Sequence, residues 1–186
     1  MPLIIADPDA ATEVKGQRTM YMAELLDVGQ TVFDLIGAPV PDHQPAIAPF
    51  MGRSLRQAME NPSGPWPGDA GEAAYSQFPR CVRHDGNPVW FHDDIGGCEG
   101  SDSPIMGYTV RTLEWRHVRW MNWNRTTTVT DWAQPPYAME LYTHSGDDGT
   151  TIGKFETNNT AADPANAAVV ESLGAMLRSM FDTPNK

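Results

Sequence analysis

The sequence has few basic side chains, only two cysteines and no long apolar run. Its 186 residues carry 13 Lys and Arg against 24 Asp and Glu, which gives a formal net charge of −11. This acidity argues against a nucleic-acid binder, which needs basic surface to neutralise phosphates, and against adhesion to anionic membranes. No stretch approaches the ~20 apolar residues of a membrane span. Residues 2–6 form too short a run for a signal peptide. The composition is that of a soluble globular protein.

The common catalytic and metal-binding motifs are also missing. The sequence contains no G-x-S-x-G elbow, no phosphate-binding loop and no G-x-G-x-x-G fingerprint. Its five histidines lack a compact metal spacing, and the acidic pairs at 93–94 and 147–148 are typical of solvated turns. Cys81 and Cys98 do not form a C-x-x-C pair, which argues against a zinc site. The residues alone leave two buried thiols or one disulfide as alternatives.

The first third of the chain is predicted to hold one strand and two helices. The apolar run 2–6 is typical of a buried strand. Apolar residues at helical spacing predict a helix from about 18 to 36, with Gly37 as the terminating residue. A shorter helix is expected over 54–60, with Ser54 as its N-cap.

The rest of the chain is predicted to form a small sheet covered by a helix. The expected strands are 72–78, 106–112, 115–123 and 137–142, and the second and third alternate as a β-hairpin. A final helix follows the N-cap Asp163 and Pro164, and its apolar face is expected to pack on the sheet through Val170, Leu173, Leu177 and Phe181. The fold class is therefore predicted as α+β, a small antiparallel sheet packed by a C-terminal helix.

Several short motifs occur in an order that is informative. They are TVFDLIGAPVP at 31–41, AYSQFPR at 74–80, IMGYTVRT at 105–112, and ELY at 140–142 followed by DDG at 147–149 and Asn158. Together they resemble the sulfatase family of the alkaline-phosphatase-like superfamily, and most closely its iduronate-2-sulfatase branch. The resemblance implies that residues 1–71 are the end of the large α/β catalytic subdomain. It also implies that residues 72–186 are the C-terminal subdomain.

The resemblance implies sulfate-ester hydrolysis, with the catalytic residues outside this chain. Family members use a formylglycine made within a C/S-x-P-x-R motif, beside a bound Ca²⁺, so that charge on the transferring group is offset. Neither Cys81 nor Cys98 lies in such a motif. The nucleophile and the Ca²⁺ ligands would map upstream of Met1. We therefore expect no catalytic residue, no metal ligand and no cofactor in this chain, which alone should be inactive.

The resemblance also suggests which residues lie near a substrate. Gln77, Arg80, Ser103 and Met106 flank the loop that should rim the pocket for a sulfated sugar or glycosaminoglycan-like substrate. Pro104 stands where the iduronate-2-sulfatase branch has a lysine that faces the sugar carboxylate. An N-terminal sulfatase half, in the same or a separate chain, is the expected partner, and the strand at 2–6 is expected to lack its sheet neighbours.

Further expectations depend on the cellular compartment. A full sulfatase would be exported, periplasmic or lysosomal. In such a setting Cys81 and Cys98, which flank a long loop, are expected to form a disulfide. Asn124 and Asn158 begin Asn-x-Thr triplets and would be candidate glycosylation sites.

A function from a different class is left open. The chain could be a non-catalytic module that binds a polysaccharide or a partner protein through Trp90, Trp120 or Trp132. A sulfatase motif in the sequence upstream would favour the hydrolase, whereas a secretion signal directly before Met1 would favour the binding module.

Overall fold

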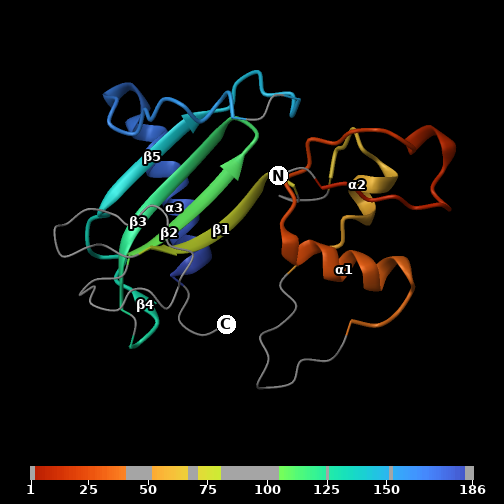
Figure 1. Cartoon of the computed structure of the whole chain (residues 1–186), viewed down its shortest axis with the longest axis horizontal. Coiled ribbons are helices and arrows are strands. Elements are labelled where there is room, and N and C mark those ends of the chain that lie inside the picture. Colours follow the sequence, from red (N-terminus) through yellow and green to blue (C-terminus); the bar gives the residue numbers. More distant parts are fainter. Residues whose placement is uncertain are drawn as a thin grey trace. The chain divides into compact units, whose positions relative to one another are not determined.

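The chain forms two compact units in a computed structural model (Figure 1). The structure describes residues 3–40, 52–66, 71–80, 105–124, 126–150 and 153–182. One unit is Met1–Ala74 and the other is Tyr75–Lys186. Among the described residues, no helix is both long and apolar enough to cross a membrane. The assignment of residues 1–71 and 72–186 to the two sulfatase subdomains stays a prediction.

The first unit contains η1 (Thr12–Val14), α1 (Leu25–Leu35) and α2 (Arg56–Glu60). The predicted helix over 18–36 is thus confirmed in its second part only. A capping box between Glu24 and Asp27 begins α1, and the Met22 N–H donates to the Gly71 carbonyl at 3.0 Å, which holds the preceding segment outside the helix. At the other end, Gly37 has a φ of +64°, as expected of a terminating glycine.

The start of the chain departs from the prediction. Residues 3–6 are not a strand, and Ile4 is 89% exposed. No described strand pairs with this segment, and an apolar run becomes a buried strand only when a neighbouring strand and a packing layer cover it. The prediction of a buried strand at 2–6 is therefore wrong for residues 3–6.

Helix α1 packs with its polar side inward. Asp27 and Thr31 are buried, whereas Leu25, Val32 and Ile36 are 72%, 50% and 68% exposed. These three residues recur along one face of the helix, and we call them the apolar stripe.

Hydrogen bonds fix the inward side of α1 to the segment before α2. The Arg53 N–H donates to Asp27 Oδ1 at 2.8 Å, and the Leu55 N–H donates to Thr31 Oγ1 at 2.9 Å. Ser54 Oγ donates to Asp34 Oδ2 at 2.5 Å and also accepts from the Arg56 N–H at 3.2 Å. The prediction of Ser54 as the N-cap is therefore wrong, because the helix begins at Arg56 after the N-cap Leu55. Ser54 still accepts a hydrogen bond from the first N–H of α2.

The second unit is built on a five-stranded sheet. Its strands are β1 (Ala73–Arg80), β2 (Ile105–Thr112), β3 (Trp115–Asn124), β4 (Val129–Thr130) and β5 (Ala138–Thr143). The order is β1-β2-β3, with β5 on the other side of β3 and β4 paired to the end of β3. Strands β2 and β3 form the predicted antiparallel hairpin, with Arg111 opposite Arg116 next to the turn.

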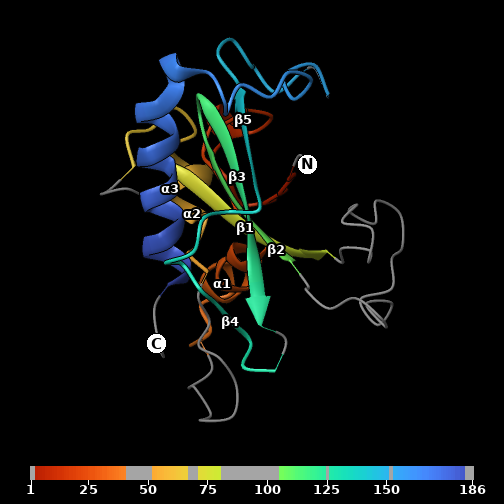
Figure 2. The same ribbon diagram turned by 90° about the vertical axis from the view of Figure 1, so that its left-hand side faces the viewer.

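Helix α3 (Ala167–Phe181) covers one face of this sheet, as Figure 2 shows. Asp163 caps the preceding 3-10 turn by accepting from the Ala165 N–H at 2.9 Å. Val170, Leu173 and Leu177 are buried, and the Phe181 ring lies 4.7 Å from that of Tyr108 on β2. The predicted docking of this helix is confirmed, and the fold is α+β.

Candidate functional site

The two faces of the sheet differ in character because strand residues alternate. On β3, His117 and Met121 are buried on the side of α3, where the Arg119 Nη2 also donates to the Val170 carbonyl at 3.4 Å. Arg116, Val118 and Trp120 point the other way, to what we call the open face. Polar and aromatic side chains gather there.

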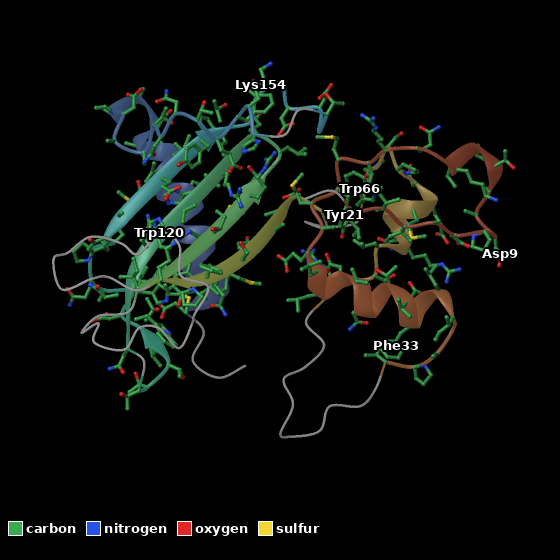
Figure 3. All side chains as sticks on the ribbon, viewed as in Figure 1. Asp9, Tyr21, Phe33, Trp66, Trp120 and Lys154 are labelled. Carbon is green, nitrogen blue, oxygen red and sulfur yellow. The ribbon has the colours of Figure 1, made fainter. Side chains whose placement is uncertain are left out.

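Trp120 lies on the open face in β3, opposite the first residue of β5, and Figure 3 labels it. Its indole Nε1 donates to Glu140 Oε1 at 2.7 Å. The Arg80 guanidinium, at the end of β1, lies 5.4 Å from the Trp120 ring and 5.6 Å from the Phe78 ring. These four residues form an aromatic–arginine cluster, in which two aromatic faces attract and orient one cation.

Tyr142 supports the cluster from β5. Its hydroxyl donates to Glu140 Oε2 at 2.9 Å, so both oxygens of this carboxylate are engaged. Burial and then the hydrogen bond to Glu140 raise the pKa of Tyr142 to about 12. Tyr142 is therefore a neutral hydrogen-bond donor across the physiological pH range.

A charged network occupies the segment that follows β5. His144 lies between two carboxylates, with Nδ1 2.7 Å from Asp147 Oδ2 and Nε2 3.2 Å from Glu156 Oε1. Arg116 binds both oxygens of Glu156 at 2.7 and 2.8 Å, and Arg111 contacts Asp147 at 3.3 Å. The network attaches His144, Asp147 and Glu156 to the sheet.

The environment of the network shifts two of its pKa values. The hydrogen bond to His144 and the one from the Gly149 N–H lower the pKa of Asp147. Burial lowers the pKa of Arg111, against the opposing effect of Asp147. Among the described residues, no three His, Cys, Asp or Glu side chains converge as metal ligands. The contacts of Arg111 and Arg116 with the two carboxylates join the segment after β5 to the β2–β3 hairpin.

The predicted substrate-rim residues do not all lie together. Arg80 is on the open face, whereas Met106 is 7% exposed and pairs with Met121 on the side of α3. Gln77 is exposed on β1. Ser103, Cys81 and Cys98 lie outside the described residues, so neither the rim assignment nor the disulfide is tested.

Phe78, Glu140 and Tyr142 were not predicted as partners of Arg80. Their signal in the sequence is the alternation within β1 and β5, which puts Phe78 beside Arg80 and Glu140 beside Tyr142 on one face. Cross-strand register, which the sequence does not show, joins the two pairs through Trp120.

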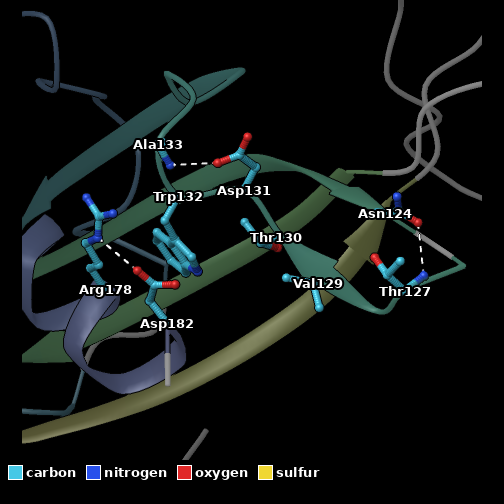
Figure 4. A pocket seen from close by; sticks show the side chains of 9 residues that line it. All are labelled: Asn124, Thr127, Val129, Thr130, Asp131, Trp132, Ala133, Arg178 and Asp182. Carbon is cyan, nitrogen blue, oxygen red and sulfur yellow. Dashed lines mark hydrogen bonds and ion pairs between the residues drawn. The ribbon is translucent and has the colours of Figure 1, made fainter. Parts of the chain in front are cut away.

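A shallow depression lies beside β4 (Figure 4). Its volume is about 400 Å³, and Asn124, Val129, Trp132 and Arg178 are among its lining residues. Trp132 is 8% exposed and its ring lies 4.9 Å from that of Tyr108, so it belongs to the core rather than to an aromatic binding surface. Trp90, also considered for binding, lies outside the described residues.

The sequence is similar to a characterised group of hydrolases. No protein-family model matches the chain. Over 151 residues it is 30% identical to human iduronate 2-sulfatase, a match that covers 73% of this chain and 26% of the relative. A solved structure of a "putative sulfatase" from Bacteroides thetaiotaomicron shares 19% identity and a TM-score of 0.45, over 82% of this chain and 24% of that one.

The sequence match agrees with the resemblance carried by the ordered motifs. The chain belongs to the sulfatase family and corresponds to a C-terminal portion of one of its members. Iduronate 2-sulfatase is a relative that it resembles. The chain spans about a quarter of the length of each of these relatives.

Proposed function

We propose that the chain is part of a sulfuric ester hydrolase acting on sulfated sugars or glycosaminoglycan-like substrates. In this proposal the catalytic residues lie outside the chain. The family uses formylglycine and Ca²⁺, and neither cysteine of this chain lies in the C/S-x-P-x-R motif in which the formylglycine is made. We therefore assign no bond-making step to this chain. Its role is to bind substrate and to complete the enzyme.

The position of Arg80 carries the proposal. It ends the stretch 74–80 that resembles the iduronate-2-sulfatase branch, and its guanidinium lies between the rings of Phe78 and Trp120. A guanidinium binds sulfate or carboxylate oxygens through two parallel hydrogen bonds. Phe78 is 57% exposed and offers an apolar surface to a sugar ring beside that charge. An anionic sugar is the ligand that matches both features.

The apolar stripe of α1 supports an N-terminal sulfatase segment as the partner. Leu25, Val32 and Ile36 are each at least half exposed on one face of a helix whose polar side is already packed. An exposed apolar surface of this kind marks an interaction site. The matched relative is about four times longer than the matching region, so it has ample chain to cover this face.

The proposal is tested by reconstitution. The purified chain is assayed with an aryl sulfate and Ca²⁺, alone and after mixing with a separately produced N-terminal sulfatase segment. We expect no turnover above a heat-killed control for the chain alone, and turnover in the mixture. Hydrolysis by the chain alone would contradict the proposal.

The role of Arg80 is tested in the same mixture. Arg80→Ala should raise KM for a sulfated disaccharide about tenfold or more, since it removes a charge-assisted contact worth about 1.5–3 kcal/mol. Arg178→Ala, which removes an exposed arginine paired with Asp182, is the matched control and should leave KM unchanged. Equal KM values for the two variants would remove Arg80 from the binding site.

A non-catalytic polysaccharide-binding module is the second candidate. The exposed Phe78 and the Trp120 ring on the open face favour it. This candidate predicts that the chain alone binds a glycosaminoglycan, and that Phe78→Ala weakens binding. Calorimetric titration with a sulfated polysaccharide and its desulfated form separates the candidates. Tight binding of both forms without any N-terminal segment would favour the module.

A further inference from the structure

The two Asn-x-Thr triplets of the sequence have different surroundings in the fold. Asn124 is the last residue of β3 and is exposed. Its Oδ1 accepts hydrogen bonds from the Thr126 N–H at 2.9 Å and the Thr127 N–H at 3.0 Å, the latter drawn in Figure 4. Two backbone donors fix the side-chain amide through its oxygen. The amide nitrogen Nδ2, the atom that receives a glycan, is therefore left outside the turn.

With respect to the residues that the structure describes, the surface around Asn124 has room for an attached sugar. Asn124 lies on the rim of the depression of about 400 Å³ described above, with Val129, Trp132 and Arg178 on its other sides. Val129 is 60% exposed, and Thr126, which supplies the hydroxyl of the triplet, is exposed as well. A sugar on Nδ2 would displace none of the buried side chains in the described ranges.

The second triplet, which begins at Asn158, is bound to β5. The Thr160 hydroxyl and N–H both donate to the Leu141 carbonyl, at 3.2 and 2.9 Å. Asn159 accepts from the Leu141 N–H at 3.0 Å and donates to the Met139 carbonyl at 3.1 Å. A transferase that reads the threonine hydroxyl of the triplet must first break these bonds to the strand.

We propose that Asn124 is an N-glycosylation site. Asn158 is not glycosylated, because the hydrogen bonds of its triplet to β5 keep the triplet from the transferase. The donor is a lipid-linked oligosaccharide diphosphate of a glycosylating compartment. The Asn124 Nδ2 forms a bond to the anomeric carbon while the bond from that carbon to the diphosphate oxygen breaks. The lipid diphosphate leaves with the electron pair, and Nδ2 loses one proton. A chain that passes through such a compartment carries a single glycan, on Asn124.

The test uses the full chain, secreted from a eukaryotic host behind a cleavable signal sequence. Intact mass is measured before and after enzymatic removal of N-glycans, and the modified asparagine is located by peptide mapping. We expect one glycan, on Asn124, and none in Asn124→Gln or Thr126→Ala. Asn158→Gln and Thr160→Ala should leave the glycan mass unchanged.

A further variant tests whether the hydrogen bonds to β5 are the reason that Asn158 is not glycosylated. Asn159→Ala keeps the triplet but removes both side-chain bonds to β5, so occupancy of Asn158 should rise from near zero. Occupancy of Asn158 equal to that of Asn124 in the unchanged chain, a folded secreted chain without any glycan, or no rise in Asn159→Ala would overturn the proposal.

Discussion

Trp120 requires a glycine opposite it in the sheet. Gly107 pairs with Trp120, and a Cβ added at Gly107 would lie 2.5 Å from the Trp120 ring. Gly107→Ala should therefore lower the free energy of unfolding by about 1–3 kcal/mol, the usual cost of overpacking. Urea denaturation followed by circular dichroism measures the change.

A double variant shows whether contact with the Trp120 ring causes the loss of stability in Gly107→Ala. In Gly107→Ala with Trp120→Ala the clash is gone, so the cost of the alanine at 107 should largely disappear. Costs that simply add would mean that the glycine is needed for another reason. The double variant also removes the ring that orients the Arg80 guanidinium.

His117 should make the stability of the fold depend on pH. It is fully buried, its Nδ1–H donates to the Glu140 carbonyl at 2.8 Å, and burial lowers its pKa to about 4. In the unfolded chain the histidine has its ordinary pKa near 6.5. Between about pH 6.5 and pH 4 the unfolded chain therefore binds a proton on His117, whereas the folded chain does not. Stability is therefore fully present above about pH 6.5 and is lost as the pH falls toward 4. We expect a loss of about 2 kcal/mol between pH 7 and pH 5.

Urea midpoints at a series of pH values test this dependence. His117→Gln cannot titrate and can still donate to the Glu140 carbonyl, so its midpoint should change much less over the same interval. An identical slope in the variant and the unchanged chain would assign the pH dependence to other groups.

At the scale of elements, α3 is held to the sheet by a few buried side chains. Leu177 is completely buried, so Leu177→Ala should lower the free energy of unfolding by about 2–5 kcal/mol. Met180→Ala, at a position that is 36% exposed in the same helix, is the control and should cost much less. A loss below about 0.5 kcal/mol for Leu177→Ala would contradict the docking of α3.

The elements that the sequence predicts well are those defined by local pattern. The β2–β3 hairpin and α3 have strong alternation or helical spacing, together with a tight turn or a capped start. Residues 3–6 and residues 18–24, which precede α1, form neither the predicted strand nor the predicted first part of a helix, because their structure depends on contacts distant in the chain. The bond from the Met22 N–H to the Gly71 carbonyl is an example.

The candidate site likewise combines one residue that local sequence predicts with neighbours that only contacts between strands determine. Arg80 follows from its motif, because a short sequence match is local information. Its aromatic and carboxylate neighbours come from β1, β3 and β5, and only the strand register brings them together. Met106 and Arg80 were both named as residues that flank the loop, and alternation along β2 puts the Met106 side chain on the side of α3.

At the scale of the whole molecule, the apolar stripe should matter for association rather than for folding. Val32→Glu and Ile36→Lys change side chains that are half exposed or more, so each should alter the free energy of unfolding by less than about 0.5 kcal/mol. Each should nevertheless weaken binding of the N-terminal sulfatase segment at least tenfold. Calorimetric titration measures the binding.

Asp27→Ala is the contrasting variant. It leaves the apolar stripe intact but removes the capping box and the bond to the Arg53 N–H, so it should cost about 1–3 kcal/mol of stability. If Val32→Glu bound the N-terminal segment as tightly as the unchanged chain, the stripe would not be its contact surface.

The polar attachment of α1 also determines how heat affects the first unit. Separating α1 from residues 53–56 exposes Asp27, Thr31 and Asp34 with their backbone partners, and comparatively little apolar surface. Exposure of polar surface lowers the heat capacity of unfolding, whereas exposure of apolar surface raises it. The second unit buries Val110, Leu141 and Leu177 completely. Per residue, the first unit should therefore have the smaller heat capacity of unfolding and a stability that changes more gradually with temperature.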